Sequence, residues 1–155
     1  MGIRELLADG KRGQYQWQTY AEAADARSAL GSGLLYHGIA PGSTVGLYSV
    51  NRPEWCLIDA ACHAYSLVTV PLYDTLGPDS VEFICNHAEL AAVCCSVECL
   101  PTLAKCLDKC PTVKLVVRET TIPPRGNACR FFVLLKYSGC TTGGVRPAQH
   151  TVAAC

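Results

Sequence analysis

The chain has 155 residues, a length that suits one domain of ordinary size. Half of the residues are hydrophobic and 17% are charged, and Lys plus Arg equals Asp plus Glu, so the formal net charge is zero. This composition argues against an intrinsically disordered chain and against a basic nucleic-acid-binding surface. The most apolar stretch, residues 56–73, is interrupted by Asp59, His63 and Pro71, so we predict no transmembrane segment. The first residues contain no apolar run long enough for a secretory signal, and we expect an intracellular protein.

In chain order, residues 15–20 have the aromatic and β-branched composition of a strand. Thr19 and Glu22 follow with the spacing of a capping box, which predicts a helix start. Apolar side chains then recur at helical spacing, and Gly38 stands where a glycine would end the helix.

Residues 45–50 are predicted to form a short apolar strand, followed by a second helix that runs to about residue 65. Asn51 is the expected N-cap of that helix. Pro53 would lie in its first turn, where a missing N–H costs nothing, and Glu54 has capping-box spacing from Asn51.

The rest of the chain continues the alternation as far as Val117. Further strands are predicted at residues 67–72, 91–96 and 113–117, and further helices at residues 78–88 and 98–109. Apolar strands that alternate with helices predict an α/β fold, here a partial doubly wound parallel sheet with helices on both faces. After Val117 the sequence becomes rich in Pro and Gly, with one candidate strand at residues 131–135. We therefore predict a packed domain over residues 14–117 and a weakly ordered C-terminal tail over residues 118–155.

Three segments carry a family resemblance: Asn-Arg-Pro-Glu-Trp at residues 51–55, residues 64–78 with Val-Pro-Leu-Tyr-Asp-Thr-Leu-Gly-Pro, and Asn-His-Ala at residues 86–88. In this order and spacing, the chain resembles the N-terminal part of long-chain fatty acyl-CoA synthetases, which are AMP-forming members of the adenylate-forming (AMP-binding) enzyme family. The similarity covers residues 14–117 and is greatest to the plant and algal peroxisomal type. The resemblance implies the N-terminal piece of the adenylate-forming enzyme fold.

The resemblance also implies a function for the parent enzyme, a long-chain fatty acid–CoA ligase that makes acyl-CoA, AMP and pyrophosphate from a fatty acid, ATP and coenzyme A. Its cofactors would be ATP, Mg²⁺ and coenzyme A, and its location the peroxisome or the cytoplasmic face of the endoplasmic reticulum. The family's chemistry needs a phosphate loop, a Thr-Glu pair, a ribose-binding aspartate and a lid lysine. None of these can be assigned securely here. We therefore expect the chain to be inactive alone and to bind these cofactors poorly.

The tail contains a degenerate version of the family's phosphate loop. Ser-Gly and Thr-Thr-Gly are present, but Cys140 separates them, and Val-Arg-Pro at residues 145–147 replaces Pro-Lys-Gly. Two interpretations remain open: a damaged remnant of the loop, or a chance pattern in a Gly- and Thr-rich segment. The weak candidates for nucleotide binding are Ser138, Gly139, Thr141, Thr142 and Gly143. No catalytic or metal-binding residue is assigned.

Other polar residues allow both a functional and a structural interpretation. Arg52 and Glu54 could clamp a substrate or could belong to a helix start. The loop Tyr73-Asp74-Thr75 follows a strand, where α/β sheets place ligand crevices, but it could equally be a structural turn. His63 and His87 are predicted to be packed or surface residues rather than ligands, and His37 is predicted to lie at a helix end, where a partial positive charge suits the dipole.

Eleven cysteines are present, with Cys95 and Cys99, and Cys106 and Cys110, four residues apart. The chain has no C-x-x-C pair, so a zinc site is not favoured, although an exposed thiol could be sensitive to oxidation. An alternative function is a non-catalytic interaction module that binds a full-length synthetase or a lipid or membrane surface. A third is a cysteine-based metal or redox domain. We also expect self-association through exposed apolar surface.

Overall fold

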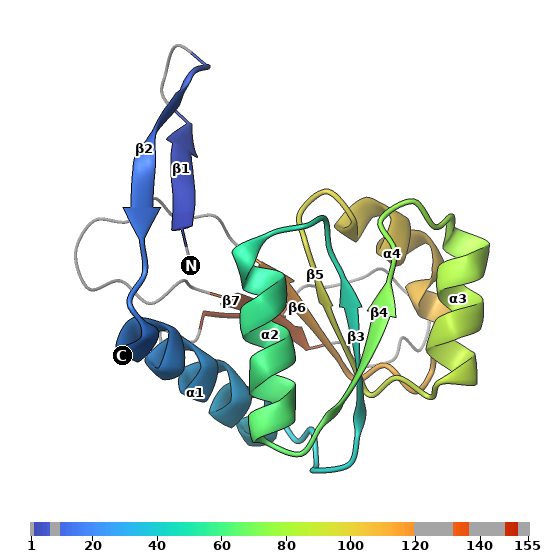
Figure 1. Cartoon of the computed structure of the whole chain (residues 1–155). Coiled ribbons are helices and arrows are strands. Elements are labelled where there is room, and N and C mark those ends of the chain that lie inside the picture. The colour runs from blue at the N-terminus through green and yellow to red at the C-terminus, as the bar shows by residue number, and fades with distance from the viewer. Residues whose placement is uncertain (1, 7–9, 120–131, 137–147, 152–155) are drawn as a thin grey trace.

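The computed structural model describes residues 2–6, 10–119, 132–136 and 148–151. The elements in these ranges follow one another in the order β1 (Gly2–Leu6), β2 (Arg12–Trp17), α1 (Tyr20–Tyr36), β3 (Thr44–Tyr48), α2 (Pro53–Ala64), β4 (Val68–Leu72), α3 (Pro78–His87), β5 (Ala92–Cys95), α4 (Leu100–Cys106), the 3₁₀ helix η1 (Leu107–Lys109), β6 (Leu115–Glu119), β7 (Phe132–Lys136) and β8 (Ala148–Thr151). From β2 to β6, strands and helices alternate in the predicted order (Figure 1).

A six-stranded sheet with the order β4-β3-β5-β6-β7-β8 forms the centre of the described part of the chain. The four strands β4, β3, β5 and β6 are parallel, and the crossovers between them contain helices. These findings confirm the predicted α/β class. The strand predicted at residues 131–135 is found as β7, which pairs antiparallel with β6, and β8 pairs antiparallel with β7. Strand β6 itself continues to Glu119, beyond the domain boundary predicted at Val117.

The strand predicted at residues 15–20 exists as β2 but lies outside the parallel sheet. It forms a two-stranded antiparallel hairpin with β1, which projects away from the larger sheet (Figure 1). A strand that enters a parallel sheet must be apolar on both faces. In β2, however, Gln14 and Gln16 alternate with exposed Tyr15 and Trp17, so the strand cannot be buried between two helix layers.

Local chemistry explains where the helices begin. The predicted capping box is confirmed: the Glu22 amide donates to Thr19 Oγ1, and the Glu22 carboxylate accepts from the Thr19 amide. The N-cap predicted at Asn51 is wrong, because Arg52 is the N-cap of α2 and its side chain makes no capping hydrogen bond. Proline at the first helical position keeps the preceding residue extended, and Arg52 has φ −156° and ψ 159°.

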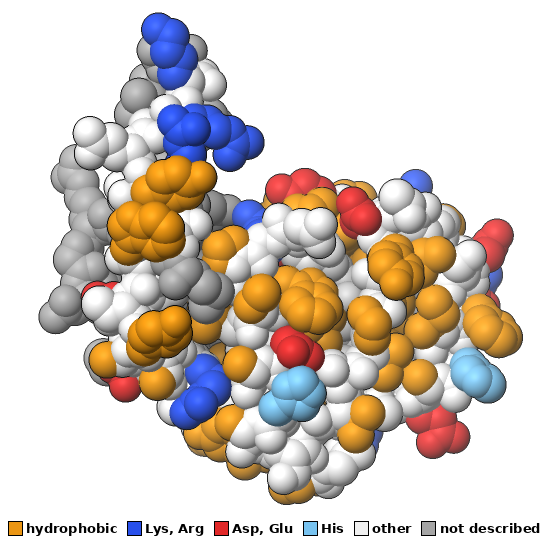
Figure 2. Space-filling view, viewed as in Figure 1, with side chains coloured by type: hydrophobic (Ala, Val, Ile, Leu, Met, Phe, Trp, Pro, Cys, Tyr) orange, Lys and Arg blue, Asp and Glu red, His pale blue; other side chains and the backbone are white. Residues whose placement is uncertain are grey.

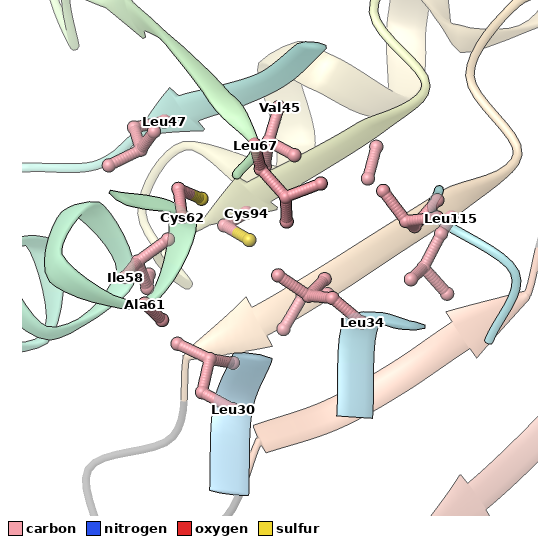
Figure 3. Packing of buried hydrophobic residues seen from close by; sticks show 13 residues of the cluster. Leu30, Leu34, Val45, Leu47, Ile58, Ala61, Cys62, Leu67, Cys94 and Leu115 are labelled. Atoms are coloured by element: carbon pink, nitrogen blue, oxygen red, sulfur yellow. The ribbon is translucent and has the colours of Figure 1, made fainter. Parts of the chain in front are cut away.

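Hydrophobic side chains cover both faces of the sheet, as predicted. One core cluster joins α1 and α2 to the face that carries Val45, Leu47 and Cys94; Figure 3 shows it at close range. The other joins α3 and α4 to the opposite face, which carries Val93 and Cys95. Successive residues of β5 thus contribute to different clusters, as the alternation of side chains along a strand requires.

Candidate functional site: the carboxyl edge of the parallel sheet

The carboxyl ends of β3 and β5 meet at the point where the connections change direction. Helix α2, which follows β3, packs on one face of the sheet, and α4, which follows β5, packs on the other. Tyr48 and Cys95, the last residues of these two strands, are direct partners, and the Ser96 amide donates to the Tyr48 carbonyl over 3.1 Å. In open α/β sheets, ligand crevices form outside the strand ends at such a switch point.

A cluster of charged side chains occupies this edge. Arg52 Nη1 lies 3.4 Å from Glu119 Oε2, at the end of β6, and 3.6 Å from Glu98 Oε2, in the segment after β5. Arg52 Nε lies 3.4 Å from Glu54 Oε2, in the first turn of α2. One guanidinium therefore links the segments that follow β3 and β5 to the last residue of β6. We call Arg52, Glu54, Glu98 and Glu119 the edge cluster.

Burial determines the electrostatics of the edge cluster. The side chain of Glu119 is 1% exposed, and this loss of solvation raises its pKa above the usual carboxyl range despite the nearby guanidinium. Ser49 Oγ donates a 3.0 Å hydrogen bond to Glu119 Oε2, which favours the ionised form. Glu98 is much more exposed, and hydrogen bonds from its own backbone and from Ser96 lower its pKa. The pKa of Glu119 is therefore raised and that of Glu98 is lowered, although both carboxylates lie beside the same guanidinium.

The edge cluster can position loops but is not suited to hold an anion. Three carboxylates surround one guanidinium, so a triphosphate approaching this edge would meet excess negative charge. Oriented backbone N–H groups and free cations are what phosphate binding requires. The described geometry therefore supports the interpretation of Arg52 and Glu54 as part of the helix start, rather than as a substrate clamp.

The loop that follows β4 lies at the same edge and is held by a tyrosine. Tyr48 Oη donates to the Leu76 carbonyl over 3.1 Å, and the Leu76 amide donates to the Tyr73 carbonyl over 3.0 Å. Burial is the main reason that the pKa of Tyr48 is raised. The side chains of Tyr73, Asp74 and Thr75 point to solvent, with Tyr73 69% exposed. The turn is therefore fixed by its backbone, and its side chains remain accessible.

His63 and His87 contact side chains of their own helices, and most of the described cysteines are buried. His63 Nδ1 lies 3.6 Å from Asp59 Oδ2, and His87 stacks on Phe83 with ring centroids 5.4 Å apart. Seven of the described cysteines are buried: Cys62, Cys85, Cys94, Cys95, Cys99, Cys106 and Cys110. Within the described ranges, no three His, Cys, Asp or Glu side chains are grouped so that they could hold a metal ion.

The candidate phosphate loop lies outside the described residues, which end at 136 and resume at 148. The gap contains all five candidate residues, Ser138, Gly139, Thr141, Thr142 and Gly143. Sequence reasoning missed Ser49 and Glu119. Ser49 directly follows the apolar run at residues 45–48, which is the signal that could have identified it, whereas Arg118 separates Glu119 from the apolar run before it. Within the described part of the chain, no helix has the length and apolar character needed to cross a membrane.

Comparison with known proteins identifies the family. The sequence profile described as AMP-binding enzyme matches residues 4–130, which is most of the chain. The chain belongs to the AMP-binding enzyme family. It is 59% identical over 117 residues to the peroxisomal long chain acyl-CoA synthetase 6 of Arabidopsis thaliana, a match that covers 76% of this chain. It is 47% identical over 159 aligned positions to fatty acyl-CoA synthetase A of Dictyostelium discoideum, which covers 98% of this chain.

Solved structures agree on the fold of this AMP-binding domain. The anthranilate CoA ligase AuaEII, in complex with anthranoyl-AMP, matches with a TM-score of 0.64 at 19% identity, over 68% of this chain and 20% of that protein. At this identity the match shows the fold alone. The chain corresponds to 16% of the length of the Arabidopsis relative and 23% of the Dictyostelium one. It therefore spans only part of the AMP-binding enzymes that it matches.

Proposed function

We propose that this chain is the N-terminal scaffold portion of a long-chain fatty acid–CoA ligase. The whole enzyme would convert a fatty acid, ATP and coenzyme A into acyl-CoA, AMP and pyrophosphate. The observation that carries this proposal is the 59% identity to a plant long chain acyl-CoA synthetase over 117 residues. In this proposal, the described residues build the parallel sheet and hold the segments at its carboxyl edge in place, while residues elsewhere in the enzyme carry out the chemistry.

The described geometry supports a scaffold role. The edge cluster joins the ends of β3, β5 and β6 through buried or partly buried ion pairs, which makes this edge rigid but leaves it without excess positive charge. A nucleoside triphosphate does not fit these residues, because three carboxylates surround the single guanidinium, and among the described residues no group of His, Cys, Asp or Glu side chains could hold Mg²⁺, so no step of the reaction is assigned to them. We propose that the binding sites for ATP, Mg²⁺ and coenzyme A lie outside the described residues. The chain alone would then be inactive.

The proposal also includes the cellular location of the enzyme and the self-association of the isolated chain. The plant relative is named as peroxisomal, and we propose a peroxisomal location for the enzyme that contains this domain. Self-association of the isolated chain is also expected, because several large hydrophobic side chains are exposed, including Tyr20, Tyr36 and Phe83.

Two assays test the proposal. In the first, the purified chain is incubated with ATP, Mg²⁺, palmitate and coenzyme A, and AMP is measured; we expect none above background. Turnover by the chain alone would contradict the scaffold role. In the second, the matching segment of the Arabidopsis synthetase is replaced by residues from this chain. The chimera should retain ligase activity, with the unmodified synthetase as the control. A chimera that folds normally, as judged by circular dichroism, but is inactive would contradict the ligase assignment.

A further inference from the structure

Three thiols meet between α3 and the segment that contains α4 and η1. Cys85 lies on α3, Cys106 is the last residue of α4, and Cys110 directly follows η1. The side chain of Cys110 is in hydrogen-bonding contact with those of both Cys85 and Cys106. Its Sγ also donates to the Cys106 carbonyl over 3.3 Å. We call Cys85, Cys106 and Cys110 the thiol cluster.

The thiol cluster is enclosed by this part of the chain itself. Cys85 and Cys110 are 0% exposed, and Cys106 is 1% exposed. All three belong to the core cluster that joins α3 and α4 to the sheet, and Figure 1 shows these two helices side by side. Figure 2 shows hydrophobic, acidic and histidine side chains on the outer surface at α3. Because the thiols are already covered here, further residues of a longer enzyme would leave them buried.

Polar contacts hold α3 against η1 beside the thiol cluster. Lys109 Nζ lies 3.1 Å from Glu82 Oε2, and Asn86 Nδ2 donates to the Lys109 carbonyl over 3.1 Å. Asn86 directly follows Cys85, and Lys109 directly precedes Cys110, so this hydrogen bond joins the neighbours of the two thiols. Cys85 and Cys110 are therefore held together by the fold, although they lie far apart in the sequence.

The surroundings of the three thiols distinguish Cys110 from its neighbours. Burial is the main reason that the pKa of Cys85 is raised to about 12 and that of Cys106 to about 11, and contact with Cys110 contributes to both increases. Burial also raises the pKa of Cys110, but its hydrogen bonds with Cys85 and Cys106 oppose that rise. The thiolate, rather than the thiol, attacks an oxidant. Cys110 is therefore the thiol of the cluster that reacts first, and its neighbours are the thiols that can attack the oxidised sulfur.

Geometry selects Cys85 as the partner of Cys110. Side chains four residues apart on a helical backbone have Cβ atoms about 5–6 Å apart, whereas a disulfide needs Cβ atoms about 3.5–4.5 Å apart. Cys106 and Cys110 have this sequence spacing, and Cys106 Sγ donates back to the Leu103 carbonyl over 3.2 Å. We propose that Cys85 and Cys110 form a disulfide that locks α3 to the segment after η1 when a peroxide oxidises Cys110. This inference does not depend on the ligase assignment.

Hydrogen peroxide accepts all the electrons and protons that the two thiols lose. The Cys110 sulfur attacks one peroxide oxygen, the O–O bond breaks, and a sulfenic acid and one water form. The Cys85 sulfur then displaces the hydroxyl group from Cys110 as a second water, and the S–S bond forms. The two thiols together lose two protons and two electrons, and these convert one peroxide into two waters. The new bond closes a loop of about 25 residues and restricts the unfolded chain.

Two proteases separate the three thiols for a direct test. Combined cleavage after Lys, Arg and Glu places Cys85 in residues 83–89, Cys106 in residues 106–109 and Cys110 in residues 110–114. The reduced chain is treated with hydrogen peroxide, the remaining thiols are blocked with N-ethylmaleimide in denaturant, and the digest is analysed by mass spectrometry. We expect residues 83–89 linked to residues 110–114. The link should form about tenfold faster for each unit of pH near neutrality, because the thiolate fraction increases.

Thermal unfolding provides the second arm. Peroxide treatment should raise the melting temperature of the unmodified chain by about 6–12 °C, as expected for a disulfide that closes a loop of this size. C85S and C110S should lose both the link and the temperature shift. The matched control is C106S, which removes the third thiol of the same cluster and should keep both. Circular dichroism of each reduced variant measures its folding, and the peptide map of the unmodified chain does not depend on any variant.

Three results would overturn the proposal. The first is a link from residues 110–114 to residues 106–109, which would make Cys106 the partner. The second is complete blocking of Cys85 and Cys110 by N-ethylmaleimide after a peroxide treatment that oxidises the exposed Cys56. The third is a link between Cys110 and a second copy of the chain, which a non-reducing gel would detect as a dimer.

Discussion

Replacing Arg52 with methionine preserves a long apolar side chain but removes a charge that three carboxylates share. The Nε atom of Arg52 lies 3.4 Å from the Glu54 carboxylate. Its Nη1 atom lies 3.6 Å from the Glu98 carboxylate and 3.4 Å from the Glu119 carboxylate. Glu119 is the member most affected, because its side chain is 1% exposed and cannot recover its solvation in the folded state. R52M should therefore destabilise the fold through an uncompensated buried charge.

The expected magnitude follows from burial and distance. Removing one partner of a buried ion pair costs about 3–5 kcal/mol. Here the Arg52 side chain is 16% exposed and that of Glu98 is 59% exposed, and the separations exceed those of short charge-assisted hydrogen bonds. We therefore expect the lower end, about 3 kcal/mol of unfolding free energy. For a chain of this size, that corresponds to a melting temperature lower by about 6–12 °C.

Urea and thermal unfolding, followed by circular dichroism in reducing buffer at neutral pH, measure this loss. The matched control K105M removes an exposed cation and should change the unfolding free energy by less than about 0.5 kcal/mol. Because the destabilisation comes from the unpaired Glu119 charge, R52M/E119Q should be more stable than R52M. The reasoning is refuted if R52M unfolds within about 0.5 kcal/mol of the unmodified chain, or if E119Q makes R52M still less stable.

The pH dependence of the same variants has a definite sign. Burial raises the pKa of Glu119 in the folded chain above the ordinary value of 4.5. Between these two pKa values the folded state holds more protons than the unfolded state, so the contribution of Glu119 to stability falls as pH rises. The unfolding free energy of E119Q, compared with that of the unmodified chain, should therefore increase as pH rises above about 4.5. An E119Q advantage that grows as pH falls would contradict this assignment.

Two further predictions concern packing and thiol chemistry. A methyl group on Gly31 would collide with the Tyr65 ring, so G31A should destabilise by about 1–3 kcal/mol, whereas Gly33 faces open space and G33A should stabilise by about 0.5–1 kcal/mol in the same urea assay. Equal effects of the two substitutions would contradict this packing. Cys56 is exposed, while burial raises the pKa of Cys62 to about 12, so with an aromatic disulfide reagent C56S should remove one fast-reacting thiol and C62S none.

Signals that act within one turn of the chain were readable from the sequence. The Thr19–Glu22 capping box needs only residues three apart, and it forms as predicted. Proline at the start of α2 also acts locally, but it moved the N-cap from Asn51 to Arg52, because the proline ring restricts the residue before it. The alternation of apolar strands with helices predicted the α/β class, and the ordered motifs predicted the AMP-binding family.

Long-range contacts were decided by the tertiary structure. No local pattern states that β5 lies between β3 and β6, or that β2 pairs with β1 outside the main sheet. The same limit applies to the edge cluster, where Arg52 meets Glu119 because the ends of β3 and β6 are brought to one edge by the crossovers between them. Local sequence restricts the backbone over a few residues, whereas strand order and buried charge pairing depend on which surfaces the whole chain can bury together.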